Sequence, residues 1–214
     1  MKVNNFFAGI FSLLISQVLV KIFGVLYSLY LTNKVGFGDE GNAIYMSGYQ
    51  IYALLLTLSS IGVPNAISKL ISEKNSIGDY KNEERILKIS ILIFSIVGFC
   101  GSIIIFVFSK YISNNIIQIP EANLSLKVLS PAVFFVSIIS VMRGYFNGKG
   151  MIYITAKSQF YEQVVKSILT IILVEIVSKV SNYNTEAMAS TANLATTLAT
   201  LFSLIYICCL LYTS

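Results

Sequence analysis

The chain has 214 residues, of which 56% are hydrophobic and only 12% are charged, and its mean hydropathy is +0.77. Soluble domains carry about 25% charged residues, so the composition argues against a water-soluble domain. The formal charge is +5, which basic loops on one side of a membrane would explain. Because no basic stretch is interleaved with aromatic residues, we expect no nucleic-acid partner.

Long apolar runs predict transmembrane helices. Ile89 to Phe108 is the clearest run, with twenty residues and no charge. Such a helix rises about 1.5 Å per residue and crosses a hydrocarbon core of roughly 30 Å. Backbone amides in the bilayer must bond within their own helix, so we expect an all-α, polytopic six-helix bundle. The predicted spans are 6–31, 42–63, 87–108, 124–143, 158–178 and 187–208.

The two ends of the chain carry separate expectations. The first apolar run is longer than the core of a signal peptide and lacks a small-x-small cleavage site, so it predicts an uncleaved span. Residues 209–214 match the translation of a sequencing adapter. We interpret them as an artefact that follows a transmembrane lobe of residues 1–208; ordinary membrane-helix sequence is the alternative.

The basic residues predict the orientation of the chain. Four of them fall on one predicted side, at Lys34, Lys110, Lys127 and Lys179. Positive charge remains on the cytoplasmic side of a membrane, so the richer side and the amino terminus are predicted to be cytoplasmic. That richer side has nine basic residues: Lys2, Lys69, Lys74, Lys81, Arg85, Lys88, Arg143, Lys149 and Lys157.

Two cytoplasmic loops are predicted. The longer one, 64–86, begins at Pro64 and should contain a short amphipathic surface helix. The second runs from Arg143 to Gly150, with Gly144, Phe146 and Gly148 as its structural residues. Arg143 and Lys149 in this loop suit contacts with phosphate or lipid head groups.

Span one contains an ionisable residue near its middle. Gln17, Lys21, Gly24 and Ser28 are spaced to form one polar stripe on an apolar helix. A charge at this depth costs about 2.5–3.5 kcal/mol, so the functional interpretation is a cavity-facing cation that attracts an anionic substrate. A structural lysine that snorkels or pairs with a carboxylate is the alternative.

Span five carries Glu162 and Lys166 in the favoured order for an i,i+4 ion pair. Gln159 and Gln163 widen the same face. The pair either locks span five to a neighbour or lines the substrate cavity, and the sequence leaves both open.

Catalytic and metal-binding patterns are missing from the sequence. There is no histidine, and the three cysteines form no spaced metal-ligand pairs. We therefore expect no enzyme activity, metal site or cofactor.

Four motifs, taken together and in order, resemble a known family. They are Gly38-Asp39-Glu40-Gly41, Gly62-Val63-Pro64-Asn65-Ala66-Ile67-Ser68-Lys69, Arg143-Gly144-Tyr145-Phe146-Asn147-Gly148 and Ser158-Gln159-Phe160-Tyr161-Glu162-Gln163. The chain is similar to the amino-terminal half of the stage V sporulation protein B and polysaccharide-biosynthesis (oligosaccharide flippase) family. That family belongs to the multidrug, oligosaccharidyl-lipid and polysaccharide exporter superfamily, with the lipid II flippase MurJ.

The resemblance implies one lobe of a two-lobed fold of 12–14 helices. It also implies a cell-membrane flippase that moves an undecaprenyl-pyrophosphate-linked oligosaccharide, in contact with membrane lipids and with cell-wall synthesis proteins as further partners. The family's basic cavity residue falls on Lys21. Span six departs from the pattern, with Ser190, Thr191 and Asn193 where relatives are richer in Gly and Ala.

Two other functions remain open at this stage. A multidrug or cation antiporter of the same superfamily would need an acidic cavity. A non-transporting scaffold for cell-wall synthesis would need no cavity charge.

Overall fold

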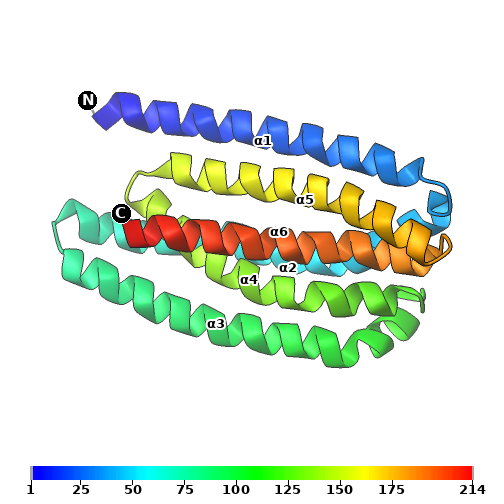
Figure 1. Ribbon diagram of the computed structural model, residues 1–214. Helices are drawn as coiled ribbons and strands as arrows, with labels where there is room; N and C mark the ends of the chain where they lie inside the picture. Colours follow the sequence, from blue (N-terminus) through cyan, green and yellow to red (C-terminus); the bar gives the residue numbers. More distant parts are fainter. Residues whose placement is uncertain (1, 214) are drawn as a thin grey trace.

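The computed structural model describes the backbone of residues 2–213 and all of its side chains except those of residues 2–10, 55 and 58–61. The described chain is helical, without strands. Six long helices run side by side (Figure 1), and one short π-helix, η1 (Ile112–Ile117), follows the third. The long helices are α1 (Lys2–Thr32), α2 (Gly38–Ser76), α3 (Tyr80–Tyr111), α4 (Ala122–Gly148), α5 (Ile152–Val180) and α6 (Thr185–Thr213).

Each predicted span lies inside one of these helices, so the expected all-α architecture is confirmed. Among the described residues, four segments are long and apolar enough to cross a membrane: Phe11–Thr32, Tyr80–Ile117, Ala122–Gly148 and Thr185–Thr213. The adapter-like residues 209–213 continue α6, whereas Ser214 and the side chain of Lys2 lie outside the described residues. Helices α2 and α5 are less apolar because they carry polar residues along their length.

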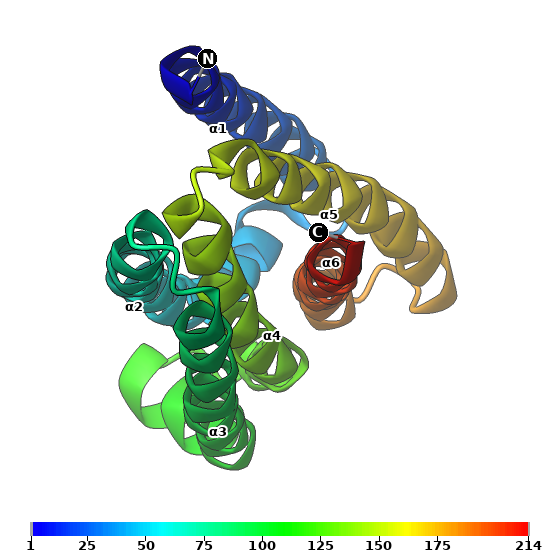
Figure 2. The ribbon, with the colours of Figure 1, turned by 90° about the vertical axis from the view of Figure 1, so that its left-hand side faces the viewer.

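The helices pack in a fixed order around α4. Helix α1 lies on α5, α5 on α6, and α6 on α4, while α2 and α3 pack against α4 (Figure 2). Helices α1 and α2 touch only briefly and diverge toward the amino-terminal end of α1 in both views (Figures 1 and 2).

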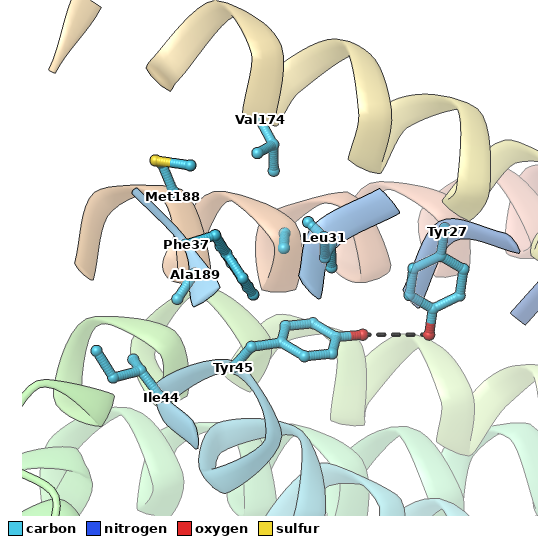
Figure 3. Close-up of a cluster of buried hydrophobic side chains, with 9 residues drawn as sticks. Tyr27, Leu31, Phe37, Ile44, Tyr45, Val174, Met188 and Ala189 are labelled. Atoms are coloured by element: carbon cyan, nitrogen blue, oxygen red, sulfur yellow. Dashed lines mark hydrogen bonds between the residues drawn. The ribbon is translucent and has the colours of Figure 1, made fainter. Parts of the chain in front are cut away.

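An apolar cluster closes the bundle at the opposite end. Figure 3 shows Tyr27 and Leu31 of α1 packed with Phe37, which precedes α2, with Tyr45 of α2, and with side chains of α5 and α6. The hydroxyls of Tyr27 and Tyr45 are 3.3 Å apart and share a hydrogen bond. This cluster holds α1 against α2 at the end that we predict to be extracellular.

The predicted loop at Pro64 is wrong. Helix α2 continues through Pro64 to Ser76, and only residues 77–79 separate it from α3. Proline is tolerated inside membrane helices because neighbouring groups replace the lost backbone hydrogen bond. The expected amphipathic segment around Ile67 and Ile71 is therefore the end of α2, and both side chains are buried.

The second predicted loop is also wrong, because Gly144, Phe146 and Gly148 belong to the last two turns of α4. A Cβ atom on Gly144 would lie 2.9 Å from the Pro64 Cα. One on Gly148 would lie 2.7 Å from the Ile71 Cβ. Small residues four apart let two membrane helices approach closely, so these glycines serve the packing of α4 on α2.

Candidate functional site

A cavity of about 360 Å³ opens where α1 and α2 diverge. We call it the groove. Four of its residues lie on α5, at successive steps of three, one and three residues. This spacing places them on one face of the helix. Its lining residues are Gln17 and Val20 of α1, Tyr49, Tyr52, Leu56 and Thr57 of α2, Arg143 of α4, Gln159, Glu162, Gln163 and Lys166 of α5, and Thr196 of α6.

Arg143 is held at the junction of three helices. Its Nη2 donates to Glu162 Oε2 at 2.7 Å and to Ser158 Oγ at 2.9 Å, both on α5. It also donates to Ser203 Oγ of α6 at 3.3 Å. The arginine side chain is 9% exposed and that of Glu162 is 21% exposed. Charge-assisted bonds of this kind are short and directional, so the guanidinium has a fixed position.

Lys166 is the central residue of α5, fourteen positions from each end of the helix. Its side chain is buried, and its Nζ lies 4.1 Å from the ring centroid of Tyr49 and 5.1 Å from that of Tyr27. The negative face of an aromatic ring attracts a cation at such distances. None of the described carboxylates forms an ion pair with Lys166.

The predicted ion pair between Glu162 and Lys166 is therefore wrong. The two residues share a face of α5, but Glu162 pairs with Arg143 of α4 and Lys166 turns to the tyrosine rings. The planar guanidinium of Arg143 pairs with the carboxylate better than a flexible ammonium on the same helix. Ser158 and Ser203 accept further hydrogen bonds from Arg143 and hold it in place. Tertiary packing thus replaced the local pairing.

Lys21 lies outside the groove lining. Its side chain is exposed, whereas Gln17, one turn earlier, faces the groove and donates from Nε2 to Gln159 Oε1 at 2.6 Å. The structure brings Gln17, Glu162, Gln163 and Lys166 together, as expected for a common cavity wall. It leaves Lys21 on the adjoining exposed face of α1.

Arg143 and Lys149 are not on a common loop. Arg143 lies inside the groove, five residues before the end of α4. Lys149 follows α4 and lies 3.0 Å from the Tyr145 hydroxyl and 3.9 Å from Glu83 Oε2. The expected loop placement of Arg143 is wrong because the helix extends past it.

Comparison with known proteins gives the family. The model of the family described as "Polysaccharide biosynthesis protein" matches residues 6–213. The chain belongs to this family. It is 30% identical over 182 residues to the lipid II flippase MurJ of Bacillus subtilis (strain 168), covering 81% of this chain and 33% of MurJ. It is 28% identical over 207 residues to stage V sporulation protein B of the same organism, covering 97% and 39%.

The fold of this polysaccharide-biosynthesis chain also matches a solved structure. A transporter of the MOP superfamily from Pyrococcus furiosus superposes with a TM-score of 0.80 at 14% identity, covering 94% of this chain and 43% of that one. The chain thus spans less than half the length of these proteins. It is a multi-pass membrane protein, and its helical fold matches part of that structure.

Sequence reasoning missed the aromatic wall of this family member's groove. Tyr49 and Tyr52 of α2 line the groove, and buried Tyr45 stacks on Tyr49 outside the lining. The ring centroids are 5.8 Å apart for Tyr45 and Tyr49 and 5.6 Å apart for Tyr49 and Tyr52. Their spacing of four and three residues places them on one helix face, which was the available signal. Ser158 and Ser203 gave no such signal, because their contacts with Arg143 depend on three helices.

Proposed function

We propose that the chain forms one lobe of a flippase that moves an undecaprenyl-pyrophosphate-linked oligosaccharide across the cytoplasmic membrane by alternating access. The observation that carries the proposal is the Lys166 ammonium in the groove, midway along α5 and without a carboxylate partner among the described residues. A buried charge in a membrane protein is costly and marks a functional site by default.

The balance of charge favours an anionic substrate. The groove lining holds two cations, Arg143 and Lys166, and one carboxylate, Glu162, which leaves a net charge of +1. Since Glu162 neutralises Arg143, the charge of Lys166 remains for a substrate. A pyrophosphate crossing in this groove would avoid the desolvation cost of crossing lipid.

The rest of the groove suits a sugar. The amide groups of Gln17 and Gln163 each offer donors and an acceptor, as hydroxyl-rich ligands require. The Tyr49 and Tyr52 rings add flat apolar surfaces with polar ends. Thr196 Oγ1 is buried at the groove with no hydrogen-bond partner among the described residues, so it is available to a ligand hydroxyl or to water.

A cation antiporter is less well supported by this geometry. Such a transporter needs a carboxylate free to exchange protons or metal ions with a cationic substrate. Glu162 is the groove's acid in this part of the chain, and it is bound to Arg143.

The driving force is proposed to be an ion gradient or the membrane potential, because no nucleotide-binding motif occurs in the sequence. One elementary charge crossing the membrane gains about 2.3 kcal/mol per 100 mV. In this proposal the amino terminus is cytoplasmic, and cell-wall synthesis enzymes supply the substrate. Neither catalysis nor a cofactor is part of it.

The test is a flipping assay in liposomes with fluorescent lipid II. The chain replaces the matched segment of stage V sporulation protein B, so that a second lobe is present. Lys166→Met should slow flipping about tenfold or more, since a charge-assisted contact is worth about 1.5–3 kcal/mol.

Lys21→Met is the matched control, because it removes the same charge from an exposed position outside the groove lining. It should reduce flipping less than Lys166→Met. Equal flipping by the Lys166→Met variant and the unsubstituted chimera would favour the scaffold alternative. A greater loss of flipping in Lys21→Met than in Lys166→Met would show that the substrate-binding cation is on α1.

A further inference from the structure

A second, smaller cavity of about 170 Å³ lies between α1 and α5. It shares no lining residue with the groove. Ser16 Oγ donates to the Ala156 carbonyl at 2.7 Å on its floor, which joins the two helices there. The remaining lining residues are Ser12, Ile15, Leu19, Lys157, Phe160 and Tyr161.

The walls of this cavity suit a hydrocarbon chain. Ile15, Leu19, Phe160 and Tyr161 present apolar or aromatic surface. The neighbouring side chains of α1 are also apolar and exposed, including Leu14 and Val18. In a membrane protein such a face is covered by lipid rather than water, so the cavity opens toward acyl chains.

One end of the cavity carries a positive charge without an acidic partner. Lys157 is exposed, and none of the described carboxylates forms an ion pair with it. Its Nζ lies 5.5 Å from the ring centroid of Tyr153. The same end of α5 has no acidic residue in its first turn and no side-chain cap, so the helix dipole adds to the positive field.

We propose that this cavity is a binding site for one anionic phospholipid, independent of the flippase activity. One acyl chain lies between α1 and α5, and the phosphate lies against Lys157 and the start of α5. Lys157 is at the end of the bundle with most basic residues, and the anionic lipids of a cytoplasmic leaflet are attracted to such residues. The site would fasten α1, which otherwise packs mainly on α5, to the bundle.

The test is lipid retention measured by native mass spectrometry. The protein is placed in nanodiscs that contain equal amounts of phosphatidylglycerol and phosphatidylcholine and is then extracted into detergent. The amounts of the two lipids that remain bound to it are compared. Lys157→Gln should lower the preference for phosphatidylglycerol about fivefold, as for one lysine near an anionic surface. Lys81→Gln, an exposed lysine at the same end of the bundle, is the matched control and should keep the preference.

Ser12→Phe separates a cavity site from simple surface attraction. The larger side chain should fill the cavity and reduce retention of both lipids, while circular dichroism shows unchanged helix content. The proposal is overturned if Lys157→Gln and Lys81→Gln give the same lipid ratio, or if Ser12→Phe retains lipid normally. Displacement of the bound lipid by undecaprenyl phosphate but not by phosphatidylglycerol would also overturn it, because the site would then belong to the polyprenyl tail of the substrate.

Discussion

Helices α3 and α5 differ in what their side chains face. Helix α3 has no charge from Ile89 to Phe108 and exposes many large apolar residues, among them Leu92, Ile96 and Phe106. Helix α5 carries Glu162 and Lys166 near its middle, yet it contacts α1, α6 and α4 and lines the groove.

The contrast reverses the usual relation between burial and polarity. In a bilayer the surrounding solvent is apolar, so apolar helices lie at the periphery and polar side chains turn inward. Strong hydropathy therefore marks the peripheral helix α3, and interruptions of hydropathy mark the groove-lining helix α5.

The largest expected loss of stability comes from substitutions in the polar contacts of α5. Arg143→Gln or Glu162→Gln alone should lower the free energy of unfolding by about 3 kcal/mol, because each leaves a charge without its partner. The double variant should lose less than the sum of the two. Thermal unfolding in detergent, read as a double-mutant cycle, measures the coupling.

Glu162→Gln combined with Lys166→Gln is the control cycle for the same helix. These residues form no ion pair, so their coupling energy should be smaller than that of Arg143 with Glu162. A larger coupling energy would show that Glu162 pairs with Lys166 and not with Arg143.

A smaller loss of stability is expected from a substitution in the apolar helix α3. A Cβ on Gly98 of α3 would lie 2.7 Å from Ser137 Cβ of α4, so Gly98→Ala should cost about 2 kcal/mol by overpacking. Gly101→Ala, nearly one turn later, would place its Cβ an ordinary 3.6 Å from Val133 Cγ1 and should cost nothing. Equal unfolding temperatures for both variants would contradict close packing at Gly98.

The smallest expected change in stability comes from the ion pair that joins the end of α1 to α5. Lys34 pairs with Glu175, and this hydrogen bond raises the pKa of Lys34. A raised pKa means that the pair stabilises the fold below the unfolded pKa of about 10.4 and that this contribution is lost as pH rises through the folded value. The unfolding temperature of the unsubstituted protein should therefore approach that of Lys34→Gln as the pH rises through the folded pKa of Lys34.

Lys179→Gln is the control for this pH series. Lys179 is also near Glu175, at 3.5 Å, but its side chain is 69% exposed. The variant should keep most of the pH dependence of the unsubstituted protein. A constant difference between Lys34→Gln and the unsubstituted protein at all pH values would contradict the assigned pair.

The candidate site was only partly predictable. Glu162, Gln163 and Lys166 could be placed together because helical spacing puts polar residues of one helix on one face. Gln17 was predicted separately, from the polar stripe of span one. The partner of Glu162 could not be predicted, since Arg143 comes from another helix nineteen residues away. The lengths of α2 and α4 were underestimated because glycine and proline usually end helices in water, whereas in membranes glycine also allows close packing.

The sequence by itself determined that this chain is an all-helical membrane protein, because apolar runs of about twenty residues satisfy their backbone hydrogen bonds in lipid as helices. Only the tertiary structure decided which cation faces the groove. Lys21 and Lys166 both lie within predicted spans. Lys166 lines the groove because the packing of α5 against α1, α6 and α4 turns its side chain inward, onto Tyr49 of α2 and Tyr27 of α1. Lys21 remains exposed on α1.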